Sequence, residues 1–99
     1  MSLEFSLEIN VRAAGKVADW ETATITCADN ALLCDVMDDM KEAFEPAERL
    51  ARVLNGTLEV RLMLGDMPIY DVRGVRHEEA HTAWVRCAAL ALGRLELAA

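Results

Sequence analysis

The ten residues LEFSLEINVR, at positions 3–12, alternate strictly between apolar and polar side chains. Apolar residues occupy every odd position from Leu3 to Val11, and Glu, Ser, Asn or Arg occupies every even position. Successive side chains of a β-strand point to opposite faces of the sheet. The pattern therefore predicts a strand with one face buried against an apolar layer and the other face exposed to water.

Three further segments carry a similar alternation. Residues 20–28 place apolar side chains on one face and threonines on the other, and a turn at residues 15–16 predicts that they form a hairpin with the first strand. Residues 57–64 and 69–75 flank a Gly-Asp-Met-Pro turn and predict a second hairpin.

Helical periodicity replaces the alternation at residues 31–44, where the apolar side chains gather on one side of a helical wheel. Asp29 and Asn30 are candidates for the N-cap of this helix. Pro46 has no N–H to donate inside a helix, so we expect the helix to stop before it. Proline suits the first turn of a helix, and a second short helix is predicted at residues 47–54.

The element order is therefore strand-strand-helix-(helix)-strand-strand-helix, with the last helix at about residues 77–95. In the fourth strand we expect Tyr70 and Val72 to face inward. Each strand is apolar on one face only, which predicts an α+β, two-layer sandwich: a four-stranded, mostly antiparallel sheet with helices packed on one face. A chain of 99 residues without a linker is one domain, residues 1–99.

The acidic residues are unevenly distributed along the chain. The formal net charge is −7, and residues 1–50 contain 11 Asp and Glu against 4 Lys and Arg, whereas residues 51–99 contain 6 of each. The strongest concentration lies on one side of the helix at 31–44 and comprises Asp35, Asp38, Asp39 and Glu42. We interpret this acidic face as a binding surface for another protein, of basic character, with a merely solvated helix face as the alternative.

Charge and composition argue against several classes of partner. An acidic chain without a basic patch is repelled by nucleic acid and by anionic membrane surfaces, so we expect neither as a partner. No apolar run approaches the ~20 residues of a membrane span. Cys27, Cys34 and Cys87 form no close-spaced pair, which favours free thiols in the reducing cytoplasm. We expect Cys27 and Cys87 in the core and Cys34 on the polar side of its helix.

The segment His77-Glu78-Glu79-Ala80-His81 matches the pattern H-E-x-x-H. It resembles the signature of the zincin metalloproteases over these five residues. The resemblance implies that His77 and His81 bind zinc and that Glu78 acts as general base toward a metal-bound water. A third ligand would have to come from the 18 residues that follow, where Glu96 is the only carboxylate.

A structural interpretation of the two histidines competes with the metal site. On a helical wheel, His77 and His81 share a stripe with apolar residues of the last helix, namely Trp84, Val85, Ala88, Leu92 and Leu95. We therefore expect both histidines at the edge of the core. No catalytic residue, bound metal or other cofactor is expected on this interpretation.

The last helix has a second apolar edge, formed by Ala83, Leu90 and Leu97. A flank of small residues, Ala80, Cys87 and Ala91, lies between this edge and the core stripe. An apolar surface of this width favours a homodimer formed through the C-terminal helix. Trp20 lies on the threonine face of the second strand, where we expect a small apolar cluster under the hairpin, with an anchor for a partner as the alternative.

These features favour a non-enzymatic, acidic binding or regulatory module that acts through protein–protein contacts, of the inhibitor, immunity or accessory type. Two alternatives remain open. One is a zinc-dependent hydrolase that uses residues 77–81, and the other is a domain that binds a small ligand between the sheet and the helices.

Overall fold

The alternating segment at the N-terminus forms strand β1 (Ser2–Ala13) in the computed structural model, which describes residues 2–98. Its inward side chains Phe5, Leu7, Ile9 and Val11 are at most 2% exposed. This row lies at the centre of the hydrophobic core. The predicted one-sided burial of the first strand is therefore confirmed.

The sheet has the order β2-β1-β3-β4, and every neighbouring pair is antiparallel. Its other strands are β2 (Lys16–Ala28), β3 (Thr57–Leu64) and β4 (Met67–Arg76). The predicted hairpins β1–β2 and β3–β4 are confirmed, and β1 pairs with β3 in the middle of the sheet. Strands β2 and β4 are consequently the two edges of the sheet.

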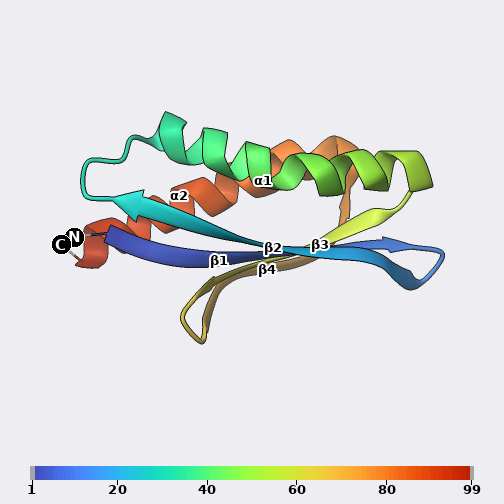
Figure 1. The fold of residues 1–99 in the computed structure, drawn as a ribbon, viewed down its shortest axis with the longest axis horizontal. Helices are drawn as coiled ribbons and strands as arrows, with labels where there is room; N and C mark the ends of the chain where they lie inside the picture. Colours follow the sequence, from blue (N-terminus) through green and yellow to red (C-terminus); the bar gives the residue numbers. More distant parts are fainter. Residues whose placement is uncertain (1, 99) are drawn as a thin grey trace.

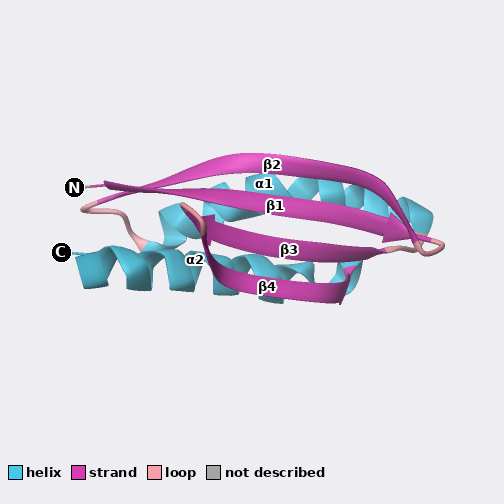
Figure 2. Cartoon of the chain, turned by 90° about the horizontal axis from the view of Figure 1, so that it is seen from below, coloured by secondary structure: helices cyan, strands magenta, loops and turns pink. Residues whose placement is uncertain are grey.

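Two helices cover one face of this sheet, and the other face is open (Figures 1 and 2). Helix α1 (Leu33–Leu54) lies over β1 and β2. A short 3₁₀ helix, η1 (His77–Glu79), leads into α2 (Ala80–Ala98), which runs beside α1. The predicted α+β, two-layer architecture is confirmed. Within residues 2–98, neither helix is long and apolar enough to cross a membrane.

Helix α1 differs from its prediction because it runs unbroken through Pro46. The buried side chains continue in phase on both sides of the proline: Val36, Met40, Phe44, Ala47 and Ala51. A proline inside a helix costs about 3 kcal/mol. Complete burial of one side chain such as Met40 or Phe44 contributes about 1.5–3 kcal/mol. A continuous helix that keeps the whole stripe on the sheet is therefore favoured over a break, and Pro46 itself is exposed.

The two ends of α1 were predicted with different success. The N-cap residue is Leu32, which makes no side-chain cap hydrogen bond, so the assignment of Asp29 or Asn30 as N-cap was wrong. The end predicted for the second, short helix, at residue 54, is where α1 ends. Asn55 adopts the left-handed conformation, and the Gly56 N–H donates to the Ala51 carbonyl oxygen at 2.8 Å, which is typical of a Schellman motif.

The face that α2 buries is rotated relative to the predicted core stripe. Ala80, Cys87 and Ala91, predicted as a flank, are completely buried, whereas Val85 and Leu92 are only partly buried. The rotation arises because α2 packs against α1 as well as against the sheet. Small side chains let two helix backbones approach closely, and they therefore occupy the most enclosed side of α2.

Gly56 offers a direct test of how β1 and the end of α1 fit together. A Cβ at this position would overlap the backbone carbonyl oxygen of Arg12 on β1. We expect Gly56→Ala to lower the free energy of unfolding by about 1–3 kcal/mol in urea titrations. The control is Gly93→Ala, because a Cβ on Gly93 meets nothing within 4 Å. Helix propensity should raise the stability of that variant by about 0.5–1 kcal/mol. Equal effects of the two substitutions would contradict the close approach of Gly56 to the Arg12 carbonyl oxygen.

Candidate functional site

The acidic face of α1 is fully displayed on the surface. Asp35, Asp38, Asp39 and Glu42 are all exposed. Among residues 2–98, none of the four takes part in a side-chain hydrogen bond or an ion pair. The structure therefore brings together the four predicted site residues as a group of unneutralised carboxylates.

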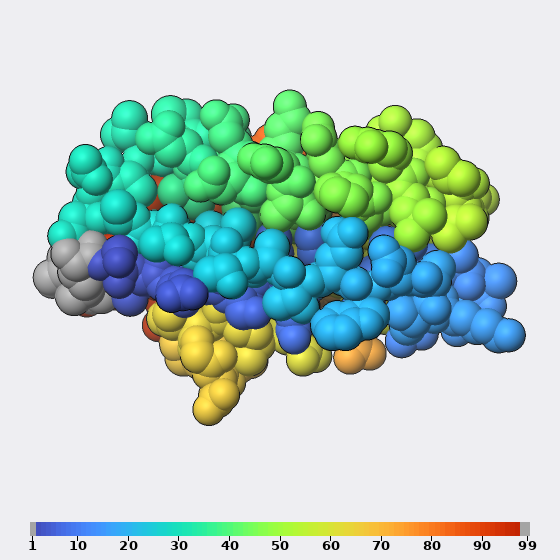
Figure 3. Space-filling view, in the orientation of Figure 1, coloured from blue at the N-terminus to red at the C-terminus, as the bar shows by residue number. Residues whose placement is uncertain are grey.

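Part of this face borders a groove between α1 and the edge strand β2. The groove is lined by Asp39, Glu42, Ala43 and Pro46 from α1 and by residues 21–26 of β2. Its deeper part reaches Leu7 and Ile9 on the inner face of β1. Figure 3 shows this side of the molecule, with the surface of α1 above that of β2. The groove therefore has an apolar floor and an acidic rim.

The negative charge of Asp39 on α1 affects the ionisation of Cys27 on β2. Burial raises the pKa of the Cys27 thiol, and the negative charge of Asp39 raises it further. Cys27 lies on the inner face of β2 and is completely buried. Asp39 therefore lies near enough to β2 for its charge to act on the Cys27 thiol.

The open face of the sheet carries a second group of charged side chains, but there the charges are paired. Arg61 lies 3.5 Å from Asp71 and 3.9 Å from Glu8, measured between guanidinium nitrogen and carboxylate oxygen. On the same face, Arg12 forms an ion pair and a hydrogen bond with Glu59. Carboxylates and guanidinium groups alternate across strands, and this face is close to electrically balanced.

Glu59 shows the effect of this pairing on ionisation. Burial acts to raise the pKa of its carboxyl group. Hydrogen bonds from Asn10 and Arg12, with the charges of Arg12 and Arg73, outweigh burial and hold the pKa below its ordinary value. Glu59 therefore stays ionised at lower pH than an isolated glutamate. The folded state gains stability from this carboxylate above the ordinary pKa and loses it as the pH falls through the lowered pKa.

Trp20 stands on the same open face, opposite Asn10 on β1, and is 65% exposed. The expected apolar cluster under the hairpin was therefore wrong. Trp20 borders a shallow hollow together with Glu8, Asn10, Glu59, Arg61, Asp71 and Arg73. The sequence indicated this placement. Side chains an even number of residues apart on a strand share a face, and Trp20 stands at such a spacing from the exposed Thr22, Thr24 and Thr26.

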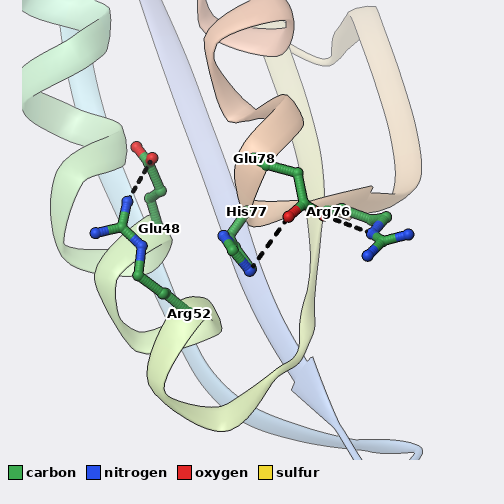
Figure 4. Close-up of polar contacts among 5 residues, drawn as sticks. All are labelled: Glu48, Arg52, Arg76, His77 and Glu78. Atoms are coloured by element: carbon green, nitrogen blue, oxygen red, sulfur yellow. Dashed lines mark hydrogen bonds and ion pairs between the residues drawn. The ribbon is translucent and has the colours of Figure 1, made fainter.

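The H-E-x-x-H segment does not form a metal site within residues 2–98, where no group of three or more His, Cys, Asp or Glu could hold a metal ion. His77 belongs to η1, before α2 begins, and its Nε2 lies 3.7 Å from Glu78 Oε2 (Figure 4). Glu78 Oε1 pairs with Arg76 Nε at 2.6 Å. Glu78, which a zincin would use as base, is therefore engaged by a guanidinium group.

The two histidines also differ in burial. His77 is partly buried, as expected for a residue at the edge of the core, but His81 is exposed, so the expectation was wrong for His81. The His81 ring meets the Trp84 ring edge-to-face at 4.6 Å between ring centres. The rotation of α2 that buries Ala80 and Cys87 turns His81 toward solvent. His81 lies beside a hollow between α1 and α2 that also includes Lys41, Glu45 and Arg49.

The comparisons with known proteins returned no matching family model, no matching curated protein and no matching solved structure. The function is therefore inferred from the geometry and charge of the described residues.

The three thiols should differ sharply in reactivity. Cys27 and Cys87 are completely buried, and burial raises the pKa of Cys87 to about 12, whereas Cys34 is exposed. We expect iodoacetamide at pH 8 to attach one adduct per native chain, at Cys34, as measured by intact mass. Cys34→Ser should remain unlabelled until denaturant is added. Rapid labelling of two thiols in the native wild-type chain would contradict the burial of Cys27 and Cys87.

The acidic face should reduce the stability of the fold. Asp35 and Asp39 are like charges at spacing i, i+4. We expect Asp39→Asn to raise the free energy of unfolding by about 0.2–0.5 kcal/mol at low salt. The gain should shrink in 1 M NaCl, where the screening length falls to about 3 Å.

Glu45→Gln is the matched control for this measurement. Glu45 has Lys41 and Arg49 at the same spacing, so its removal should bring no gain. An equal gain from both substitutions, measured by urea unfolding, would show that general net charge and not the acidic face sets the effect.

Proposed function

We propose that this chain is a non-enzymatic binding or regulatory module that recognises a basic protein partner through the acidic face of α1. The observation that carries the proposal is the contrast between the two charged surfaces. On the open sheet face, Glu59, Asp71 and Glu8 lie beside arginines. On α1, the four carboxylates of the acidic face have no such partners within residues 2–98.

The arrangement of carboxylates on α1 lowers the stability of the fold as long as no partner is bound. The pairs Asp35–Asp39 and Asp38–Glu42 each place like charges one helical turn apart, at a cost of about 0.2–0.5 kcal/mol per pair. A docked Lys or Arg would attract both carboxylates of a pair and so offset their mutual repulsion. Unpaired charge of one sign also steers an oppositely charged partner and accelerates its association.

Two further parts of the proposal concern the cellular compartment and the oligomeric state. We place the module in the cytoplasm, on the strength of its odd number of well-separated cysteines. A homodimer through α2 remains a prediction. Leu97 and Leu90 are 79% and 38% exposed, but Ala83, the third member of that edge, is buried. The exposed apolar edge of α2 is therefore narrower than its sequence pattern indicated.

Affinity capture from an extract of the cells that encode the chain tests the proposed function. Proteins retained by the wild-type chain are quantified against those retained by Asp38→Asn/Asp39→Asn. Glu79→Gln/Glu96→Gln is the control, because it removes the same charge from exposed residues of η1 and α2. We expect basic partners to be lost about tenfold from the acidic-face variant only, and more readily at high salt. Retention of every partner by Asp38→Asn/Asp39→Asn would refute the proposed function.

A further inference from the structure

The two edges of the sheet differ in how well they are protected from pairing with another strand. On β4, Pro68 cannot donate a ladder hydrogen bond, and Gly74 has a φ of 71° where the register with β3 shifts. Such interruptions are typical of edges that resist strand addition. Strand β2 pairs with β1 in unbroken register from Asp19 to Ala28, and this stretch contains neither glycine nor proline. Its outer edge is therefore regular.

This regular edge is accessible and lies directly beside the acidic face. Thr22, Thr24 and Thr26 are exposed, and Figure 3 shows the surface of β2 below that of α1 along this side of the molecule. A strand added outside β2 would send alternate side chains over the groove between β2 and α1. The remaining side chains would lie beside the threonines on the open face.

The groove is suited to long basic side chains. Ala43 and Pro46 offer apolar surface for an aliphatic stem, and Asp39 and Glu42 supply charge at the rim. Lysine and arginine place their stems on apolar surface while the charged group reaches outward. The opposite side of the added strand would meet Thr22, Thr24 and Thr26, which favour β-branched or polar cross-strand neighbours.

We propose that the partner binds by strand addition: an extended segment with basic residues at alternate positions pairs with the outer edge of β2 and inserts its basic side chains into the groove beside α1. This inference rests on the proposed function and specifies how the basic partner is recognised. Main-chain hydrogen bonds supply affinity that does not depend on sequence, and the acidic rim selects basic side chains.

A second copy of this chain is disfavoured as the occupant. If two β2 edges paired about a two-fold axis, the α1 helices would flank the junction on the same face of the joined sheet. Asp39 and Glu42 of both copies would then face one another across it, without a cation from the groove lining to separate them. The same carboxylates that attract a basic segment oppose this dimer.

The probe for the test is the capped peptide acetyl-Thr-Lys-Thr-Lys-Thr-Lys-Thr-amide, titrated into the full chain at low salt. Calorimetry gives the Kd, and hydrogen exchange by NMR follows the β2 amides of residues 21–28. We expect binding and slower exchange of alternate β2 amides, those on the outer edge. A peptide of the same sequence with every backbone nitrogen methylated keeps its charge but cannot pair, and it should not bind.

Two charge-matched variants separate groove docking from general attraction. Asp39→Asn/Glu42→Gln removes the acidic rim, and we expect the Kd to rise about tenfold. Glu79→Gln/Glu96→Gln removes the same charge from exposed residues of η1 and α2 outside the lining of the β2 groove, and the Kd should rise less than threefold. Circular dichroism should show both variants folded.

The remaining outcomes overturn the inference in distinguishable ways. Equal weakening by both variants without slower β2 exchange, or unchanged binding of the methylated peptide, refutes strand addition and leaves the acidic-face function standing. The same holds if the peptide fails to bind at millimolar concentration while affinity capture still shows partners that depend on Asp38 and Asp39. If the peptide does not bind and no such partners exist, both proposals fail. A concentration-dependent dimer that protects the β2 edge without peptide shows that a second copy is the occupant.

Discussion

One-sided burial of the central strand is the constraint on which the rest of the structure depends. Strand β1 pairs with both β2 and β3, so the face on which Phe5 and Leu7 are buried becomes the inner face of the whole sheet. Antiparallel pairing keeps directly opposite residues on the same face, and the inner faces of all four strands must therefore be covered together. Both helices consequently lie on one side, and the open side keeps its polar residues.

The same constraint explains why tertiary packing overrode the local sequence preferences at two places. Pro46 is a strong local signal for a helix break, yet the buried stripe of α1 continues through it because Phe44 and Ala47 belong to one continuous core. In α2, the small residues Ala80, Cys87 and Ala91 are completely buried, whereas Val85 and Leu92 are only partly buried. The small residues face inward because the helix has two neighbours, α1 and the sheet, and not the sheet alone.

Whether a charged side chain of this molecule is paired depends on its neighbours in space more than on the composition of the chain. The carboxylates of the sheet face lie within reach of arginines from adjacent strands, whereas those of the acidic face of α1 face solvent and the groove. Paired charges on the surface contribute little to stability. A group of unpaired like charges beside a regular strand edge combines electrostatic selection with backbone pairing. Both surfaces carry exposed carboxylates, but they differ in chemical capacity for this reason.

The sequence by itself determined the four strands, the presence of helices on one face, and the four residues of the acidic face. These features follow from periodicity, which depends only on the geometry of single elements: two residues per repeat in a strand and 3.6 in a helix. The structure alone decided the continuity of α1, the rotation of α2, the exposure of His81, and the pairing of Arg61 with Glu8 and Asp71. These depend on which elements become neighbours and at what distance. Such contacts join residues far apart along the chain, and no local pattern encodes them.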